Sequence, residues 1–261
     1  MDTKKDELAK ATGTALAVIN YQADAGMGIE EADKDSFAIP FLAVLQGLSP
    51  QIETVAGARP GLFINTITNE LIEAVEVIPV AFQRRYLRWT PRSAGGGFKG
   101  QLTVAEVESM IASGAAKNNG GKNGDSLCVQ EDGKPGDELK DTRIHFVLMR
   151  SPTTGLWSPA IISLASTAIK RSKRWLTMID GIKEIGADNK PFTPPSFSRV
   201  YKVTTEKETN NEGSWYSPVF AVSGKVEDAN LYASCKKLHA SVASGAVKAQ
   251  PPAEEGQSKD F

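Results

Sequence analysis

Residues 70–89 have the sequence ELIEAVEVIPVAFQRRYLRW and contain the pattern from which the fold is predicted. They are rich in valine, isoleucine and aromatic residues, which favour β-strands, and so is the segment 61–65 before them. Residues 66–69, with the sequence TITN, have the composition of a hairpin turn. We therefore predict a β-hairpin whose second strand continues to residue 89. Because side chains alternate along a strand, one face is predicted to carry Arg84, Tyr86 and Arg88, and the other Arg85, Leu87 and Trp89.

Outward from this hairpin, the sequence predicts two more hairpins and three helices. The hairpins are expected at 143–163 and 199–226, with turns near 152–155 and 210–213. The helices are expected over 103–116, 166–182 and 231–242, the first of them with a capping box at Thr103 and Glu106. Residues 117–141 are rich in Gly, Asn, Lys and Asp and are predicted to form a mobile loop. The result is a mainly β (α+β) fold, either a small barrel or a curved antiparallel sheet with helical additions.

Charge is distributed unevenly along the chain. Residues 1–35 contain eight acids and four lysines, and residues 249–261 contain three acids and one lysine. Since the formal net charge of the whole chain is −1, residues 36–248 carry about +5. We predict a single domain over 36–248, between a flexible acidic arm, 1–35, and a disordered acidic tail, 249–261. A basic body of this kind favours a polyanion as its partner.

Composition excludes several classes of protein. With 261 residues, 41% of them hydrophobic, the chain can bury a substantial core. Its two cysteines cannot build a disulfide framework, and its first residues lack the apolar stretch of a secretory signal. No run of about 18 apolar residues is present. These features predict a cytoplasmic protein with no membrane partner.

Three basic stretches of the sequence contain no acid. They lie between Glu76 and Glu106, between Asp141 and Asp180, and between Asp188 and Glu206. Arginines can bind phosphates bidentately, and aromatic rings can stack on unpaired bases. The cations and neighbouring aromatic residues are therefore the predicted nucleic-acid-binding residues, namely Arg84, Arg85, Tyr86, Arg88, Trp89, Arg92, Lys99, Lys170, Arg171, Lys173, Arg174, Arg199, Tyr201, Lys202, Trp215 and Tyr216. The alternative interpretation is a solvated sheet edge and helix face, with Trp89 and Trp175 in the core.

The sequence contains no recognisable catalytic set. It lacks a phosphate-binding glycine loop with its lysine, a nucleophile elbow and a nuclease-like group of carboxylates. The two cysteines and two histidines, Cys128, His145, Cys235 and His239, lack the paired short spacing of a zinc site. We therefore predict no enzymatic activity, no metal and no other cofactor.

Four segments carry a resemblance to a known class of protein. They are residues 40–50 (PFLAVLQGLSP), 84–89 (RRYLRW), 166–176 (STAIKRSKRWL) and 213–220 (GSWYSPVF). In these segments the chain resembles phage-encoded single-stranded DNA-binding proteins. The resemblance implies an oligonucleotide/oligosaccharide-binding (OB) barrel that coats single-stranded DNA without strong sequence preference. It also implies a role in phage DNA replication, recombination or repair in the host cytoplasm.

The C-terminal tail adds a separate similarity, to the acidic, phenylalanine-terminated ends of many single-stranded DNA-binding proteins. By this similarity, a docking peptide for replication or recombination proteins would consist of Glu254, Glu255, Asp260 and Phe261. The tail differs from the usual pattern because its acids are few and Lys259 interrupts them.

Three other functions remain open at the level of sequence. A strand-annealing recombination protein would use similar phosphate contacts and would assemble into a homo-oligomeric ring or filament. A phage enzyme or nuclease accessory would show metal-dependent turnover of DNA. A protein-only interaction module would show no salt-sensitive DNA binding.

Overall fold

The structure is a computed structural model that describes residues 20–32, 37–120, 127–211 and 213–250. The chain divides into two units, Met1–Phe37 and Ala38–Phe261. In the first unit, residues 20–32 form successive turns with exposed side chains. All the described strands and helices belong to the second unit.

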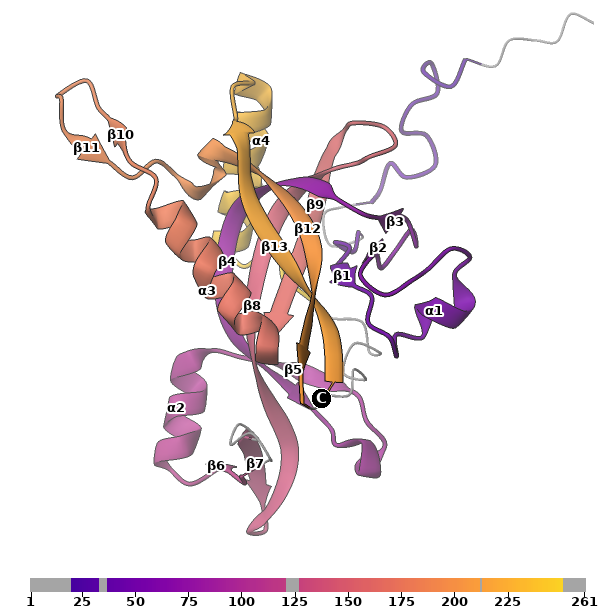
Figure 1. Cartoon of the computed structure of the whole chain (residues 1–261), viewed down its shortest axis with the longest axis vertical. Coiled ribbons are helices and arrows are strands. Elements are labelled where there is room, and N and C mark those ends of the chain that lie inside the picture. The colour runs from indigo at the N-terminus through magenta and orange to yellow at the C-terminus, as the bar shows by residue number, and fades with distance from the viewer. Residues whose placement is uncertain (1–19, 33–36, 121–126, 212, 251–261) are drawn as a thin grey trace, which may run out of the picture. The chain divides into compact units, whose positions relative to one another are not determined.

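Most of the described strands belong to one antiparallel sheet (Figure 1). These strands are β4 (Val75–Trp89), β5 (Phe98–Leu102), β6 (Ala116–Asn118), β7 (Leu127–Glu131), β8 (Lys134–Arg150), β9 (Trp157–Ala165), β12 (Arg199–Asn210) and β13 (Gly213–Lys225). Their order is β13-β12-β4-β8-β7-β6, with β5 paired to β4 and β9 paired to β8. Two smaller antiparallel sheets consist of β1 (Leu42–Val44), β2 (Phe63–Asn65) and β3 (Leu71–Ile72), and of β10 (Glu184–Ile185) and β11 (Pro191–Phe192).

The helices connect these strands. The α-helices are α1 (Gln51–Thr54), α2 (Val104–Ala112), α3 (Ile169–Asp180) and α4 (Ala229–Ala243), and the 3₁₀ turns are η2 (Arg92–Ala94), η3 (Ser166–Ala168) and η4 (Ser196–Ser198). The capping box predicted at the start of α2 is confirmed, because Thr103 and Glu106 each bond to the other's backbone N–H. Within the described part of the chain, no helix has both the length and the apolar character needed to cross a membrane.

The long strands β4 and β8 hold the main sheet together. They pair from Val77 opposite Met149 to Trp89 opposite Glu138, which confirms a strand that ends at residue 89. The predicted hairpin differs in its second strand, because only Leu71 and Ile72 pair with β2, whereas β4 begins at Val75 and belongs to the main sheet. The register shifts between Pro79 and Ala81, where proline has no N–H to donate. β12 pairs with the first residues of β4, and β5 pairs with its last ones.

Successive residues of β4 are buried on opposite faces of the sheet. Val77 packs in one cluster with Trp175 of α3, whereas Ile78 packs in another with Cys235 of α4. Figure 1 accordingly shows α3 in front of the sheet and α4 behind it. Residues 77–80 are all buried, as expected for a strand covered on both sides.

The segment 117–141 differs from its prediction as a mobile loop. It contains the end of β6, all of β7 and the beginning of β8, and residues 121–126 lie outside the described part. Val129 and Leu139 are buried against Val107 of α2. These partners are distant in sequence, so packing overrides a local composition that is typical of loops.

The predicted mainly β fold with antiparallel strands is confirmed. The barrel alternative is not, because the described strands form an open sheet with β13 and β6 at the ends of its order. Helices cover this sheet, which leaves the curved sheet with helical additions as the description that fits.

One glycine contact holds the β12–β13 hairpin against the loop before β2. Gly61 has a φ of +90°, and a Cβ at this position would lie 2.6 Å from Cε1 of Tyr216. The Gly61 carbonyl accepts a hydrogen bond from Thr205 Oγ1 at 2.5 Å. Only a residue without a side chain allows this close approach.

We predict that Gly61→Ala lowers the free energy of unfolding by about 2–4 kcal/mol, from backbone strain plus overpacking against Tyr216. The matched control is Gly95→Ala, whose φ is +102° but which has no atom within 4 Å of the added Cβ. This control should lower the free energy of unfolding only by the backbone strain, about 1–2 kcal/mol. Urea unfolding measures both, and equal losses would contradict the role of the Tyr216 contact.

Candidate functional site

The basic stretch of β4 and β5 is largely neutralised by acids of β8. Arg84 donates from Nη2 to Asp141 at 2.7 Å and from Nε at 3.2 Å. Arg88 Nε donates to Asp137 at 2.5 Å, and Lys99 Nζ donates to the same carboxylate at 3.0 Å. Burial raises the pKa of Asp137, but the hydrogen bonds and charges of Lys99 and Arg88 outweigh it and lower that pKa below its ordinary value. A stretch without acids in the sequence is therefore not a free positive surface in the fold.

The other predicted residues of this stretch differ in their burial and in their hydrogen-bond partners. Arg85 is half-buried and donates to the carbonyl of Arg84 at 3.0 Å, and the Tyr86 hydroxyl accepts from Arg84 at 3.2 Å. Trp89 is buried in the core, so its predicted role as a stacking platform is corrected. Arg92 begins η2, and its side chain lies outside the described part of the structure.

In the third basic stretch, most of the predicted residues are also paired with an acid or buried. Arg199 donates to Glu184 at 2.5 Å. Tyr201 is completely buried and is likewise removed from the candidate stacking rings. Lys202 is exposed and lies opposite Glu76 of β4. This area therefore presents little unpaired charge.

The two predicted binding residues of β13, Trp215 and Tyr216, differ in how accessible their rings are to a ligand. Tyr216 is fixed by Gln46, which accepts from its backbone N at 2.8 Å and donates to its carbonyl at 2.9 Å. Its ring contacts Gly61. Trp215 is half-buried, and Lys170 Nζ lies 6.0 Å from the centroid of its ring. Of the predicted rings, Trp215 is the one placed beside a predicted cationic residue of α3.

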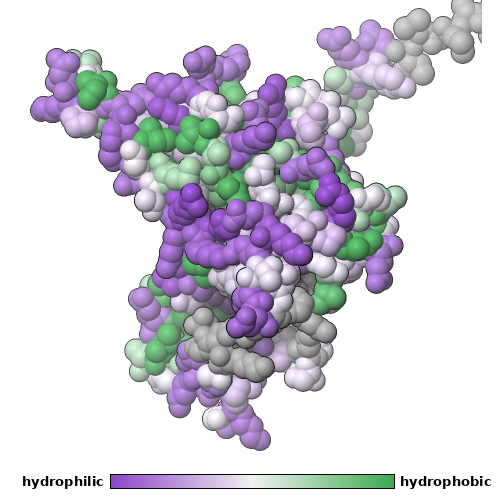
Figure 2. All heavy atoms as spheres, in the orientation of Figure 1, coloured by the Kyte–Doolittle hydropathy of each residue, from purple (hydrophilic) through white to green (hydrophobic). Residues whose placement is uncertain are grey.

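Helix α3 presents the second basic stretch. Ser172 and Trp175 are buried, which turns the opposite side of the helix outward. Lys173 and Arg174 are exposed on that side, and neither forms an ion pair with any described residue. Figure 2 shows hydrophilic residues gathered over α3, in the middle of this face. These two cations are available to an external anion.

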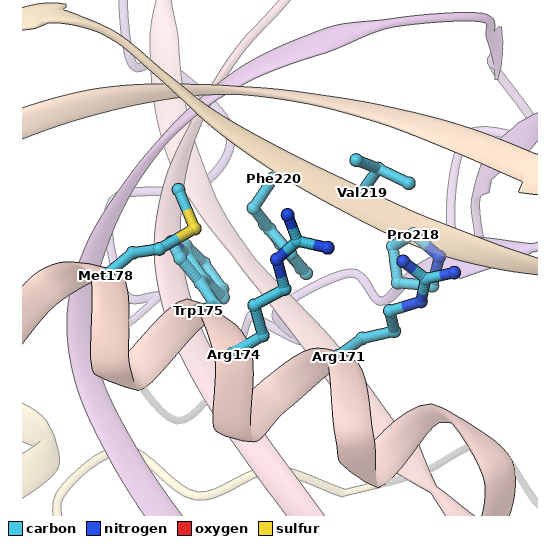
Figure 3. A pocket seen from close by; sticks show the side chains of 7 residues that line it. All are labelled: Arg171, Arg174, Trp175, Met178, Pro218, Val219 and Phe220. Carbon is cyan, nitrogen blue, oxygen red and sulfur yellow. The ribbon is translucent and has the colours of Figure 1, made fainter.

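The first turn of α3 is occupied by glutamates of β12. Lys170 pairs with Glu208, and Arg171 pairs with both Glu206 and Glu208. In Figure 3 the guanidinium groups of Arg171 and Arg174 both extend from α3 toward β13. The structure thus brings four predicted cations together on one helix, two of them paired and two free.

Buried aromatic packing fixes the orientation of α3. Trp175 stacks on Phe220 of β13 with a centroid distance of 3.9 Å and an interplanar angle of 10°. On its other side, His145 of β8 lies 4.7 Å from the Trp175 ring, and its Nε2 is 2.8 Å from Ser172 Oγ. Burial, and to a smaller extent the charge of Arg143, lowers the pKa of His145 to about 3. The imidazole is therefore neutral at physiological pH.

The described residues offer no metal site. No group of three potential ligands is found among them. Cys128 and Cys235 are buried and form no disulfide within the described part of the chain, and burial raises the pKa of Cys235 to about 11. His239 Nδ1 lies 3.0 Å from the carbonyl oxygen of Val80. Burial accounts for the two cysteines, and the contact with Val80 accounts for His239, without a metal.

The residues that the sequence interpretation missed are the acids that pair with the predicted cations. They are Glu131, Asp137, Asp141, Glu184, Glu206 and Glu208. A predicted strand register could have revealed these acids. When β4 pairs with β8, Tyr86 lies opposite Asp141, and this brings Arg84 within reach of that acid. The predicted docking residues of the tail, Glu254, Glu255, Asp260 and Phe261, lie outside the described residues and remain a prediction.

His145 predicts a pH dependence of stability. Because its folded pKa of about 3 lies below the ordinary value of 6.5, the unfolded chain binds more protons between these limits. Its contribution is complete above pH 6.5 and is lost as the pH falls toward 3, with a slope of up to about 1.4 kcal/mol per pH unit. Urea unfolding between pH 7 and pH 5 should show a shallower decline for His145→Gln than for the wild type. Parallel declines would contradict the assignment, and His239→Gln is the control.

Comparisons with known proteins identify a family. The comparisons with curated proteins and with solved structures found no match. A family model described as Pam3 phage gp34-like protein matches residues 9–248, which is most of the chain. This match indicates a phage protein and leaves its activity open. The chain belongs to the Pam3 phage gp34-like protein family.

Proposed function

We propose that this protein binds single-stranded DNA without strong sequence preference and acts, without catalysing a reaction, in phage DNA replication, recombination or repair. The observation that carries the proposal is the outward face of α3. It has two exposed cations, Lys173 and Arg174, beside the paired cations Lys170 and Arg171. Trp215 lies next to Lys170 at the edge of this face.

Charge balance favours α3 over the other basic stretches. Its four cations, Lys170, Arg171, Lys173 and Arg174, face two glutamates of β12, which leaves a net charge of +2. On β4 and β5, the three cations of the ion-pair cluster, Arg84, Arg88 and Lys99, face three acids, Asp137, Asp141 and Glu131. Excess charge that is also exposed is what a phosphate backbone requires.

The same residue types account for the lack of sequence preference. Contacts to phosphate oxygens carry no base information, and any base can stack on an indole ring. The proposed interface therefore follows the backbone of an unpaired strand and uses Trp215 as its stacking ring.

Four finer expectations form part of this proposal. The curved antiparallel sheet would take the role of the OB-like scaffold. Binding would occur in the host cytoplasm, where phage DNA is replicated. The C-terminal tail would recruit replication or recombination proteins, and the DNA-binding body could assemble as a homo-oligomer along the strand.

The test is fluorescence anisotropy of a labelled dT oligonucleotide over a salt series, with duplex DNA and RNA as competitors. The wild type is expected to bind the single strand with an affinity that falls steeply with salt. The double substitution Lys173→Glu/Arg174→Glu removes two phosphate contacts. It should weaken binding by about tenfold or more at low salt and reduce the salt slope by about 1.4.

The matched control is Lys236→Glu/Lys237→Glu, which makes the same charge change at two exposed residues of α4. This control should bind within about twofold of the wild type, apart from the long-range effect of net charge. Equal losses for both double variants would remove α3 from the interface. A wild-type protein that does not bind at low salt would overturn the function itself.

A further inference from the structure

The β12–β13 hairpin extends beyond the sheet as a two-stranded ribbon. β12 pairs with β4 only at residues 201–203, whereas residues 204–210 pair with β13 alone. We call residues 204–219 of this hairpin the ribbon. A two-stranded ribbon has little stability of its own and depends on contacts with its surroundings.

The ribbon is held from two sides. On one side, Thr205 bonds to the carbonyl of Gly61, and Gln46 bonds to the backbone of Tyr216. On the other side, the contacts with the first turn of α3 are ion pairs. Arg171 donates to Glu208 from Nη2 at 2.8 Å and from Nε at 3.2 Å.

The ion pair between Arg171 and Glu208 is largely shielded from solvent. The side chains of Arg171 and Glu208 are 11% and 14% exposed, whereas Glu206 is 50% exposed. Burial raises the pKa of Glu208, but the hydrogen bonds from Lys170 and Arg171 and the charge of Arg171 outweigh it and lower that pKa to about 2. Glu208 is therefore charged at any physiological pH.

The positive charges at the first turn of α3 favour an anion beside it. This turn contains Lys170 and Arg171 but no acidic residue, although the positive end of the helix dipole favours acids there. Glu206 and Glu208 supply the missing negative charge from β12. Carboxylates and phosphates present similar oxygens to a guanidinium group, so the two can take the same position.

We propose that Glu206 and Glu208 occupy the phosphate positions of Lys170 and Arg171 in the free protein, and that a DNA strand displaces them and releases the ribbon from α3. This inference rests on the proposed function. The strand first meets the free cations Lys173 and Arg174, which concentrate phosphate beside the paired ones. As Lys170 turns to a phosphate, it also leaves the face of Trp215, which becomes available to a base.

Removing the competing carboxylates should strengthen binding. Glu206→Gln/Glu208→Gln is expected to bind the dT oligonucleotide about tenfold more tightly at low salt, because the three ion pairs of these glutamates with Lys170 and Arg171 no longer compete. The matched control is Glu76→Gln/Glu184→Gln, which removes two carboxylates from ion pairs with Arg150, Arg199 and Lys225. It should change affinity by less than about threefold. Glu206→Gln alone is the milder variant, since this side chain is half exposed and its loss does not threaten folding.

Hydrogen exchange provides a readout that net charge does not affect. In the wild type, the oligonucleotide should slow amide exchange in α3 and accelerate it in the ribbon. In free Glu206→Gln/Glu208→Gln, ribbon exchange should already be fast. Protection of the wild-type ribbon on binding would overturn the displacement.

The two proposals fail in distinguishable ways. If the wild type binds the strand but Glu206→Gln/Glu208→Gln matches its control, the displacement is wrong and the function stands. If neither the wild type nor the variants bind at low salt, both are wrong.

Discussion

The packing of Trp175 between Phe220 and His145 is the contact on which the proposed site depends. It fixes the rotation of α3 about its own axis, because the indole ring can be buried on only one side of the helix. With Trp175 and Ser172 turned inward, Lys173 and Arg174 remain exposed. Loss of this packing would therefore disperse the cations as well as destabilise the core.

In this fold, ion pairs distinguish the cations that stabilise the structure from the cations that a ligand can bind. Asp137 and Asp141 bind arginines that lie next to them across the sheet, and these pairs hold β4, β5 and β8 together. As long as it stays paired, a guanidinium has exchanged its water for a carboxylate and gains little from a second anion. Exposed cations keep their water and can exchange it for phosphate, which is why the proposed interface lies on α3.

Local sequence predicted most of the elements because their signals lie within a few residues. Strand composition around residue 75, the capping box at Thr103 and the apolar spacing of α3 and α4 each correspond to an observed element. The segment 117–141 escaped prediction because Val129 and Leu139 are buried by α2, a partner outside any local window. The barrel alternative failed for a similar reason, since strand composition does not decide whether the sheet closes.

The sequence by itself determined a mainly β, antiparallel fold, the position of its long strands and helices, and the clustering of cations into three stretches. Only the tertiary structure decided which of those cations are free. An acid-free stretch in the sequence can still meet acids in space, as Arg88 meets Asp137 and Arg171 meets Glu208. The physical reason is that strand pairing and helix docking join residues tens of positions apart, and electrostatic interactions depend on distance in space rather than along the chain.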